Sequence, residues 1–517
     1  MASALDFPTL YQDFDRNPAG YLATTTYGRA ALSRLSEVRE HICLPDGRKV
    51  TLPVRDILDD GKVEKLNVFN DDELSNLLGG IPETTATGGN ASALIRTPQF
   101  RCRFVYLCAE TALGPLEVHV RMLLRLLTFY QVMPQFLDFL SIYASPHGRD
   151  KELRFSGFKT ETVLSNPISD TVIPELGRSG RRYQLCFNLK TVAQKSRVGW
   201  KIRQAAVHHQ FDIGRGSQMW IVGDPHAVLK ERTGEIFPEG HSFPTSFSTM
   251  QQSFASSLDI HLEFAQWAAS EWRWHILFLE QGAEELTKPA RVRERAHIEH
   301  LEPESLSDVQ KWEEKASDAV MALESNANIM KLLQKFYRDL LKDENFPKGD
   351  RHVCLQRVKK FASQLEELIC EANMQISRTK NLVKVVADRK TILIQHLQTQ
   401  NAIISSKLTA SMYEQADQSA MEAIAVRIVT IVTLIYLPAT FSSTFFSTDV
   451  VKYQQGEIFS QIALDRFLQV TLPLMFMTFV PAGIWFWIEW RRRTKKSRQT
   501  KVNFLDLFSQ ETQKLLQ

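Results

Sequence analysis

The residues best suited to chemistry lie near the C-terminus, where an uncharged run ends in the polar triplet Ser447-Thr448-Asp449. Upstream of this triplet, mostly hydroxyl-bearing side chains recur at alternating spacings of four and three residues. On identical helices around an axis, such a stripe would line a path and exchange hydrogen bonds with the water shell of an ion. Alternatively, the hydroxyls bond to carbonyls of their own helix or to packed helices. The hydroxyl stripe consists of Thr433, Leu437, Thr440, Thr444 and Ser447.

This part of the chain contains two segments without charged residues, 428–448 and 467–488. The first segment contains the stripe, and the second follows it in the sequence. Each is long enough to cross a hydrocarbon layer ~30 Å thick as a helix. We therefore predict an integral membrane protein with two transmembrane helices, a short outer loop at 449–466 and a basic tail at 489–517. The basic residues of the tail place both termini on the cytoplasmic side, although the sequence does not indicate which membrane is spanned. Pro438 in the first span favours a helix bend, which serves gating or only curvature.

The sequence before the spans excludes several functional classes. The net charge of the 517-residue chain is only +3, which argues against a nucleic-acid-binding protein that works through general basicity. We find no nucleophile elbow, zinc-protease helix or phosphate-binding loop, so we expect neither an enzyme nor a bound cofactor. His208 and His209 beside Asp212 would be a poor chelate, because adjacent strand residues face opposite sides. The six cysteines form no CxxC pair and suit a reducing, cytosolic setting.

Residues 1–283 mix strand-like and helical patterns, which predicts an α+β cytosolic domain. The segments "FRCRFVYLCA", "RRYQLCFNLK", "WKIRQAAVHHQFDI" and "QMWIVGD" are rich in β-branched and aromatic residues, as strands are. Residues 115–144 and 257–281 have the apolar spacing of helices instead.

Residues 284–427 have the pattern of a helical stalk. A charged helix is expected at 306–342, and Asp350 is suited to cap the next one. That next helix contains no proline or glycine from 352 to 437, so it could run unbroken into the first span. Its apolar residues alternate at spacings of four and three, which predicts a coiled-coil seam of about six heptads. Self-association through the seam is one interpretation, and an amphipathic helix packed within the subunit is the other. The seam comprises Val358, Ala362, Leu365, Ile369, Ala372, Ile376, Thr379, Val383, Val386, Lys390, Leu393, Leu397 and Gln400.

This layout resembles that of the CorA-type divalent cation transporters, which combine a cytosolic domain, a long stalk helix and two C-terminal spans. In that family the first span ends roughly in "MPLTFIAGIYGMNF", and "LPATFSSTFFSTDV" aligns with it without a gap. Pro438, Thr440 and Phe441 match the family pattern. Further blocks, among them "QVMPQFLDFLSIYA" and "EWRWHILFLE", resemble the CorA-like transporter domain common in filamentous fungi.

The resemblance implies a passive, homo-pentameric transporter of divalent cations, with Mg²⁺ as the expected transported or regulatory ion. The family's Gly-Met-Asn signature falls on Ser447-Thr448-Asp449, whose oxygens would coordinate the ion at the pore mouth. Asp449 would be the metal ligand that attracts the cation. The expected partners are other copies of the chain, the lipid bilayer and divalent cations, but no nucleic acid. The alternative is a non-conducting, membrane-anchored scaffold or sensor that keeps this architecture.

Overall fold

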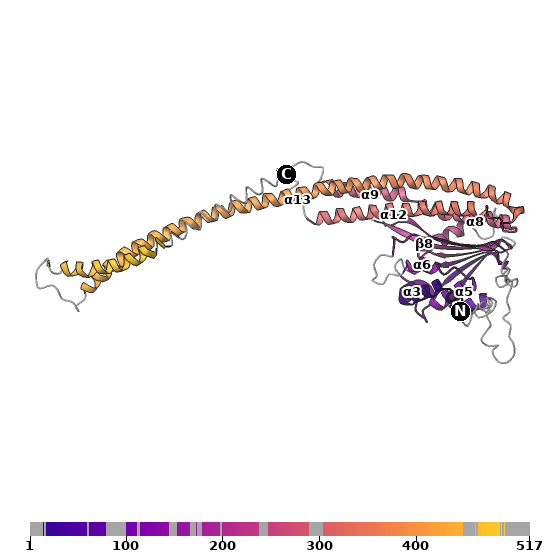
Figure 1. Cartoon of the computed structure of the whole chain (residues 1–517), viewed down its shortest axis with the longest axis horizontal. Helices are drawn as coiled ribbons and strands as arrows, with labels where there is room; N and C mark the ends of the chain where they lie inside the picture. The colour runs from indigo at the N-terminus through magenta and orange to yellow at the C-terminus, as the bar shows by residue number, and fades with distance from the viewer. Residues whose placement is uncertain are drawn as a thin grey trace, which may run out of the picture. The chain divides into compact units, whose positions relative to one another are not determined.

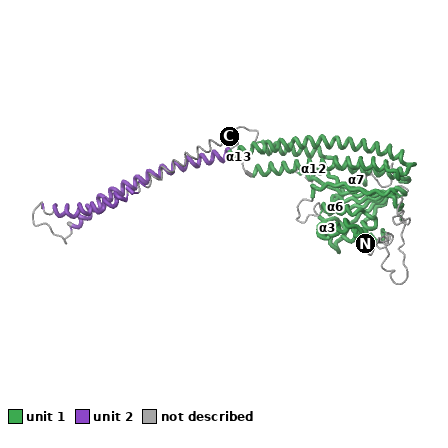
Figure 2. Tube along the Cα trace, viewed as in Figure 1, with its two compact units in different colours: residues 1–398 green, residues 399–517 purple. Residues whose placement is uncertain are grey.

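The computed structural model divides the chain into two compact units, residues 1–398 and 399–517 (Figure 2). Helix α13, Lys348–Ser447, begins in the first unit and ends in the second. The division falls within the stretch 284–427 that the sequence suggests as a stalk region. The structure describes residues 14, 17–58, 62–78, 100–110, 114–143, 152–165, 172, 178–196, 199–236, 247–288, 303–447, 461, 464–485, 487–488 and 491.

The first unit is built around a seven-stranded mixed sheet with the order β3-β2-β4-β9-β8-β7-β6. Neighbouring strands are antiparallel, except for the parallel pair β4 and β9. Two short strands, β1 Cys43–Leu44 and β5 Leu116–His119, form a separate parallel pair. The large sheet comprises β2 Leu52–Leu58, β3 Val63–Val68, β4 Phe100–Leu107, β6 Phe158–Val163, β7 Arg182–Ser196, β8 Gly199–Asp212 and β9 Ser217–Gly223.

The central strands of this sheet are apolar on both faces, because both faces are buried. On β4, Phe104 and Tyr106 belong to the core on one face, whereas Val105 and Leu107 belong to the core on the other. The four segments predicted as strands correspond to β4, β7, β8 and β9, so those predictions are confirmed.

Helices cover both faces of the sheet and produce a three-layer arrangement (Figure 1). One face packs against α3, α5 and α6, with Leu126 and Leu140 among the buried residues. The other face packs against α8, α12 and the first part of α13, with Phe264, Leu333 and Leu365 buried. The helices before α13 are α2 Gly20–Ala23, α3 Thr26–Ile42, α4 Asp71–Leu78, α5 Val120–Phe129, α6 Phe136–Ser141, α7 Val228–Ile236, α8 Met250–Ala269, α9 Trp272–Leu286 and α12 Pro303–Leu340.

Two helices expected from the sequence are interrupted, so this part of the prediction is wrong. The segment 115–144 begins as strand β5 and then forms α5 and α6, which are separated around Gln131, a residue with φ of 53°. The segment 257–281 contains parts of α8 and α9, which are separated at Glu271, with φ of 67°. Neither left-handed residue is glycine, so the usual sequence signal for such a break is missing.

The helices α9, α12 and α13 pack together and bury the apolar seam of α13. Val358 and Ile369 of the seam join the core above the sheet. Ile376 and Val386 lie in a cluster with residues of α9 and α12. Self-association through these seam residues is therefore wrong, because the same chain already covers them. The alternative of an amphipathic helix packed within the subunit describes this part of α13.

A glycine allows α9 and α12 to approach closely. A Cβ atom on Gly282 would lie 2.0 Å from a ring carbon of Trp312, whose Nε1 donates a 2.7 Å hydrogen bond to the Leu279 carbonyl. We expect Gly282→Ala to lower the free energy of unfolding by about 1–3 kcal/mol, since the clash outweighs the better helix propensity of alanine. Thermal unfolding of the full-length protein measures this change. Gly234→Ala is the control, because nothing lies within 4 Å of its added Cβ. Equal melting temperatures for Gly282→Ala and the parent would contradict the close approach.

A buried ion pair joins β2 to β4. Arg103 Nε donates to Asp56 Oδ1 at 2.6 Å, and a second guanidinium nitrogen donates to Asp56 Oδ2. The third nitrogen donates to Tyr130 Oη at 2.8 Å. The two charged side chains are only 7% and 5% exposed. Each of the three guanidinium nitrogens thus donates a hydrogen bond. These bonds offset much of the free-energy cost of removing the charged group from water.

Candidate ion-conduction site

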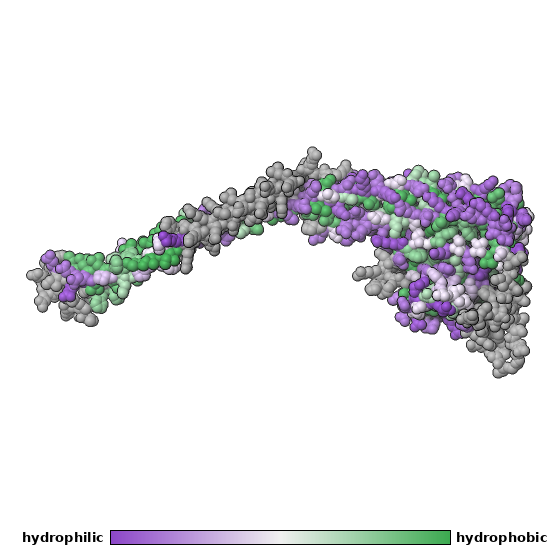
Figure 3. Space-filling view, in the orientation of Figure 1, coloured by the Kyte–Doolittle hydropathy of each residue, from purple (hydrophilic) through white to green (hydrophobic). Residues whose placement is uncertain are grey.

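The second unit contains the two apolar helices expected from the sequence. One is the end of α13 and the other is Leu464–Trp485, and both are long and apolar enough to cross a membrane. Their apolar side chains are exposed in the single chain, as Ile428 (57%) and Met477 (75%) illustrate. Figure 3 shows apolar residues gathered on the second unit, whereas the face of the first unit seen in this view carries mostly hydrophilic residues. The predicted fold class, an α+β domain followed by a long helix and two C-terminal spans, is confirmed.

The hydroxyls of the stripe donate hydrogen bonds to the helix that carries them. Thr433 Oγ1 donates to the Val429 carbonyl, and Thr444 Oγ1 donates to the Thr440 carbonyl, both at 2.8 Å. Thr440 and Ser447 donate to carbonyls three or four residues earlier in the same way. Each hydroxyl oxygen therefore directs its proton inward and keeps its lone pairs for acceptance from outside. Outward acceptors suit a hydrated cation, whose water shell presents protons to its surroundings.

The stripe lies on the side of α13 opposite its buried contact. Within the described part of the first span, Pro438 and Ser442 are the buried residues, and Thr471 is buried on the second span. We infer that the two helices pack through these faces, and Figure 1 shows them running alongside each other. Thr440 and Thr444 each lie two residues from this face, which is about 200° of helix rotation. The stripe therefore faces away from the second span.

Two buried hydroxyls in the spans were missed by sequence reasoning. Ser442 is 1% exposed and Thr471 is 5% exposed, and neither hydroxyl has a hydrogen-bond partner among the residues that the structure describes. The available signal was a polar residue in each apolar span that does not belong to the stripe, which is typical of helix–helix contacts in membranes. Pro438 lies in the same contact, and α13 continues through it without interruption.

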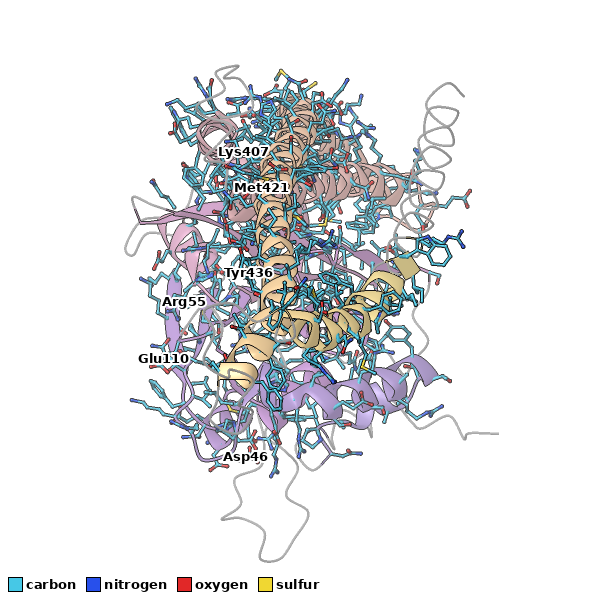
Figure 4. All side chains as sticks on the ribbon, turned by 90° about the vertical axis from the view of Figure 1, so that its left-hand side faces the viewer. Asp46, Arg55, Glu110, Lys407, Met421 and Tyr436 are labelled. Carbon is cyan, nitrogen blue, oxygen red and sulfur yellow. The ribbon has the colours of Figure 1, made fainter. Side chains whose placement is uncertain are left out.

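The stripe residue Ser447 is the last described residue of α13 and is exposed. Thr448 and Asp449, the predicted coordinating residues that follow it, lie outside the described residues, as does most of the outer loop. In the other direction along α13, Figure 4 shows Tyr436, Met421 and Lys407 at successive levels of the helix. Tyr436 and Met421 are both 65% exposed.

The histidine pair on β8 is part of the core. His208 Nε2 lies 2.9 Å from Gln184 Oε1, whereas His209 faces the other way, with its ring centroid 3.8 Å from that of Trp220. Burial lowers the pKa of His208 to about 3, so the ring is neutral near pH 7. Within the described ranges, no three or more His, Cys, Asp or Glu residues are grouped as a metal site would require. The expectation that these adjacent strand residues face opposite sides is confirmed.

Three solved structures are similar to this chain at low identity. The CorA magnesium transporter from Methanocaldococcus jannaschii is 10% identical with a TM-score of 0.32, over 83% of this chain and 95% of that one. The full-length CmaX protein is 10% identical with a TM-score of 0.36, over 84% and 99%. The cytoplasmic domain of ZntB from Vibrio parahaemolyticus RIMD 2210633 is 9% identical with a TM-score of 0.24, over 66% and 99%. Among curated proteins, no sequence matches this chain.

The family assignment comes from the N-terminal part of the chain. The family model described as CorA-like transporters matches residues 10–291, which include the whole seven-stranded sheet and helices α3 to α9. The match covers more than half of the 517 residues. It does not include the stripe or the two apolar helices. The chain belongs to the family of CorA-like transporters.

Proposed function

We propose that this protein is a homo-oligomeric channel that conducts divalent metal cations passively along the hydroxyl stripe of α13. The observation that carries the proposal is the orientation of the stripe. Thr433, Thr440 and Thr444 are exposed, their hydroxyl protons are bonded to the helix, and they lie opposite the contact with the second span. Copies of α13 around an axis would then surround the ion with acceptor oxygens.

The mouth of the path is proposed from the sequence. Ser447, Thr448 and Asp449 follow the stripe directly, and their oxygens are the ligands that hard divalent cations prefer. Asp449 adds a negative charge where the family signature has asparagine, which strengthens attraction of the cation and slows its release. Mg²⁺ is the proposed ion, and the carboxylate is the proposed metal ligand.

Oligomerisation is proposed through α13 beyond the first unit. Between residues 399 and 427 nearly every side chain of α13 is exposed in the single chain. Apolar residues recur there, and Ile404, Leu408 and Met412 lie four residues apart on one face, at 55%, 62% and 62% exposure. A row of this kind in water favours packing against another helix. A second copy of α13 fits, because a symmetric ring brings the same face of each copy to its neighbour. The proposed number of copies is five.

We further propose that both termini are cytoplasmic. The tail after the second span is rich in Lys and Arg, as cytoplasmic flanks of spans are. Arg491 lies over the ring of Trp487, 3.9 Å from its centroid, a pair suited to the membrane interface. In this arrangement residues 1–283 form the cytosolic domain, 284–427 the stalk and 449–466 the outer loop.

The test of the proposal is entry of Co²⁺ or Mg²⁺ into proteoliposomes that contain the full-length protein. We expect Thr440→Val, which keeps the shape but removes one ring of acceptors, to slow entry about threefold to tenfold, the effect of losing about one hydrogen bond. Thr478→Val is the control, because this hydroxyl belongs to the second span and donates to its own helix at Met475. Equal slowing by both variants would count against the stripe as the ion path.

A non-conducting scaffold or sensor is the second candidate. The departure of Ser447-Thr448-Asp449 from the family signature favours it, because the triplet lacks the glycine, which adopts unusual backbone angles cheaply. Ion entry no faster than into empty vesicles, with the protein folded and oligomeric, would support the scaffold and end the transporter proposal.

A further inference from the structure

A lysine without a counter-charge is buried between the sheet and α12. Lys190 of β7 is 0% exposed and is one of the largest fully buried side chains of the molecule. Its Nζ donates to the Phe155 carbonyl at 2.8 Å and to Ser325 Oγ at 3.1 Å. No carboxylate pairs with Lys190 among the described residues. Buried lysines are rare unless they are paired, so this ammonium calls for an explanation.

The lysine begins a relay of hydroxyls that reaches the surface. The Ser325 hydroxyl donates to Ser156 Oγ at 2.6 Å, and Ser156 is exposed. The direction of the relay is fixed, because an ammonium can only donate hydrogen bonds. Lys190 donates to Ser325 and Ser325 donates to Ser156, which leaves the proton of the exposed Ser156 hydroxyl without an acceptor among the described residues. A donor at the end of a charged chain is polarised and favours an anionic acceptor.

The loop that carries Ser156 is held in place on both sides. Asn188 Nδ2 donates to the Phe155 carbonyl at 2.9 Å, and the Gly157 N–H donates to Asn188 Oδ1 at 2.9 Å. The Ser156 hydroxyl is therefore presented in a fixed position, which reduces the ordering cost of binding. Arg154, two residues earlier and 82% exposed, can bring a second donor group to the same place. Its guanidinium lies 3.9 Å from Asp318 Oδ1, near the limit for an ion pair.

We propose that Lys190, Ser325 and Ser156 form an anion site at the junction of β7 and α12, and that its ligand is a phosphate-type oxyanion. Phosphate fits better than a carboxylate, because two of its oxygens can accept from the planar guanidinium of Arg154 while a further oxygen is left to accept from Ser156. The ligand supplies the negative charge that Lys190 lacks within the chain. Binding would strengthen the contact that the Ser325–Ser156 hydrogen bond already makes between the 154–157 loop and α12, the helix that packs against α13.

The test is thermal unfolding of the full-length protein in inorganic phosphate and in chloride at equal ionic strength. We expect phosphate to raise the melting temperature by about 2 °C or more near saturation, since a ligand that binds the folded state stabilises it. Ser156→Ala should abolish most of this rise without unfolding the protein, because the residue is exposed. Ser317→Ala, which alters an exposed serine of α12 that donates to the Glu313 carbonyl, should leave the rise intact. An equal rise in Ser156→Ala would overturn the site.

A pH series adds a second readout that a merely structural serine would not move. Burial lowers the pKa of Lys190 to about 8, so the ammonium loses its proton well below the usual range of lysine. The phosphate effect should be present at pH 7 and should fade as the pH rises through 8 to 9.5. Persistence of the full effect at pH 9.5 would show that Lys190 does not carry it. Replacing phosphate with ATP shows whether the site also takes a phosphate group attached to a larger molecule.

Discussion

Replacement of Asp449 by alanine is expected to lower the initial rate of Co²⁺ entry into proteoliposomes about tenfold or more. The reason is that an interaction with a charged group contributes about 1.5–3 kcal/mol, and every copy in the ring loses it at once. In the sequence the aspartate comes two residues after Ser447, the last residue of the stripe, and the proposal places it at the outer mouth of the path. Entry followed with a metal-sensitive dye inside the vesicles gives the rate.

Asp449→Asn is the matched variant, because it restores the asparagine of the family signature and keeps an oxygen ligand. We expect it to conduct better than Asp449→Ala and to release the ion more easily than the parent. Rates for Asp449→Ala equal to those of the parent would show that the triplet is not the pore mouth, even if the protein conducts.

Loss of Asp56 is expected to destabilise the sheet strongly. Asp56→Ala leaves the guanidinium of Arg103 buried with the Tyr130 hydroxyl and the Phe100 ring beside it but without its carboxylate, and breaking a buried pair costs about 3–5 kcal/mol. The measurement is the free energy of unfolding of the full-length protein in detergent. The parent pair lies between neighbouring strands, so the loss affects the sheet on which both layers of helices pack.

The control for this effect is a pair of the same kind on the surface. Asp308 pairs with Lys311 at 3.1 Å, but both side chains are more than half exposed. Asp308→Ala should change the free energy of unfolding by about 0–1 kcal/mol. Replacing Asp56 and Arg103 together with apolar residues should recover part of the loss, because no charge is then left buried alone. Similar effects for Asp56→Ala and Asp308→Ala would contradict the burial of the pair.

The sequence predicted elements whose pattern is long and continuous. Strands β7, β8 and β9 were found because buried strands keep an apolar, β-branched composition, and the spans were found because they lack charges over their whole length. The interruptions at Gln131 and Glu271 were not predictable, because tertiary packing rather than glycine holds those residues in left-handed conformations. The positions at which helices break were therefore harder to predict from the sequence than the presence of the helices and strands.

The partner of an apolar helix face cannot be read from its spacing. The seam residues Leu365 and Val386 fit a coiled coil as well as they fit a buried face, and only the positions of α9, α12 and the sheet decide between them. The hydroxyl stripe was predicted from spacing, but its orientation opposite Ser442 depended on the structure. The relay from Lys190 to Ser156 joins residues up to 169 positions apart, so no local sequence pattern predicts it.

The order of the units along the chain has a consequence for synthesis. All the residues that complete the first unit, up to Gln398, precede the apolar window of the first span. At about 5–20 residues per second, the ribosome needs several seconds to add the rest of α13, and domains fold as units in this time. The sheet and its two helical layers can thus fold before the first apolar span leaves the ribosome. Membrane targeting of this protein would then act on a chain that already carries a folded domain.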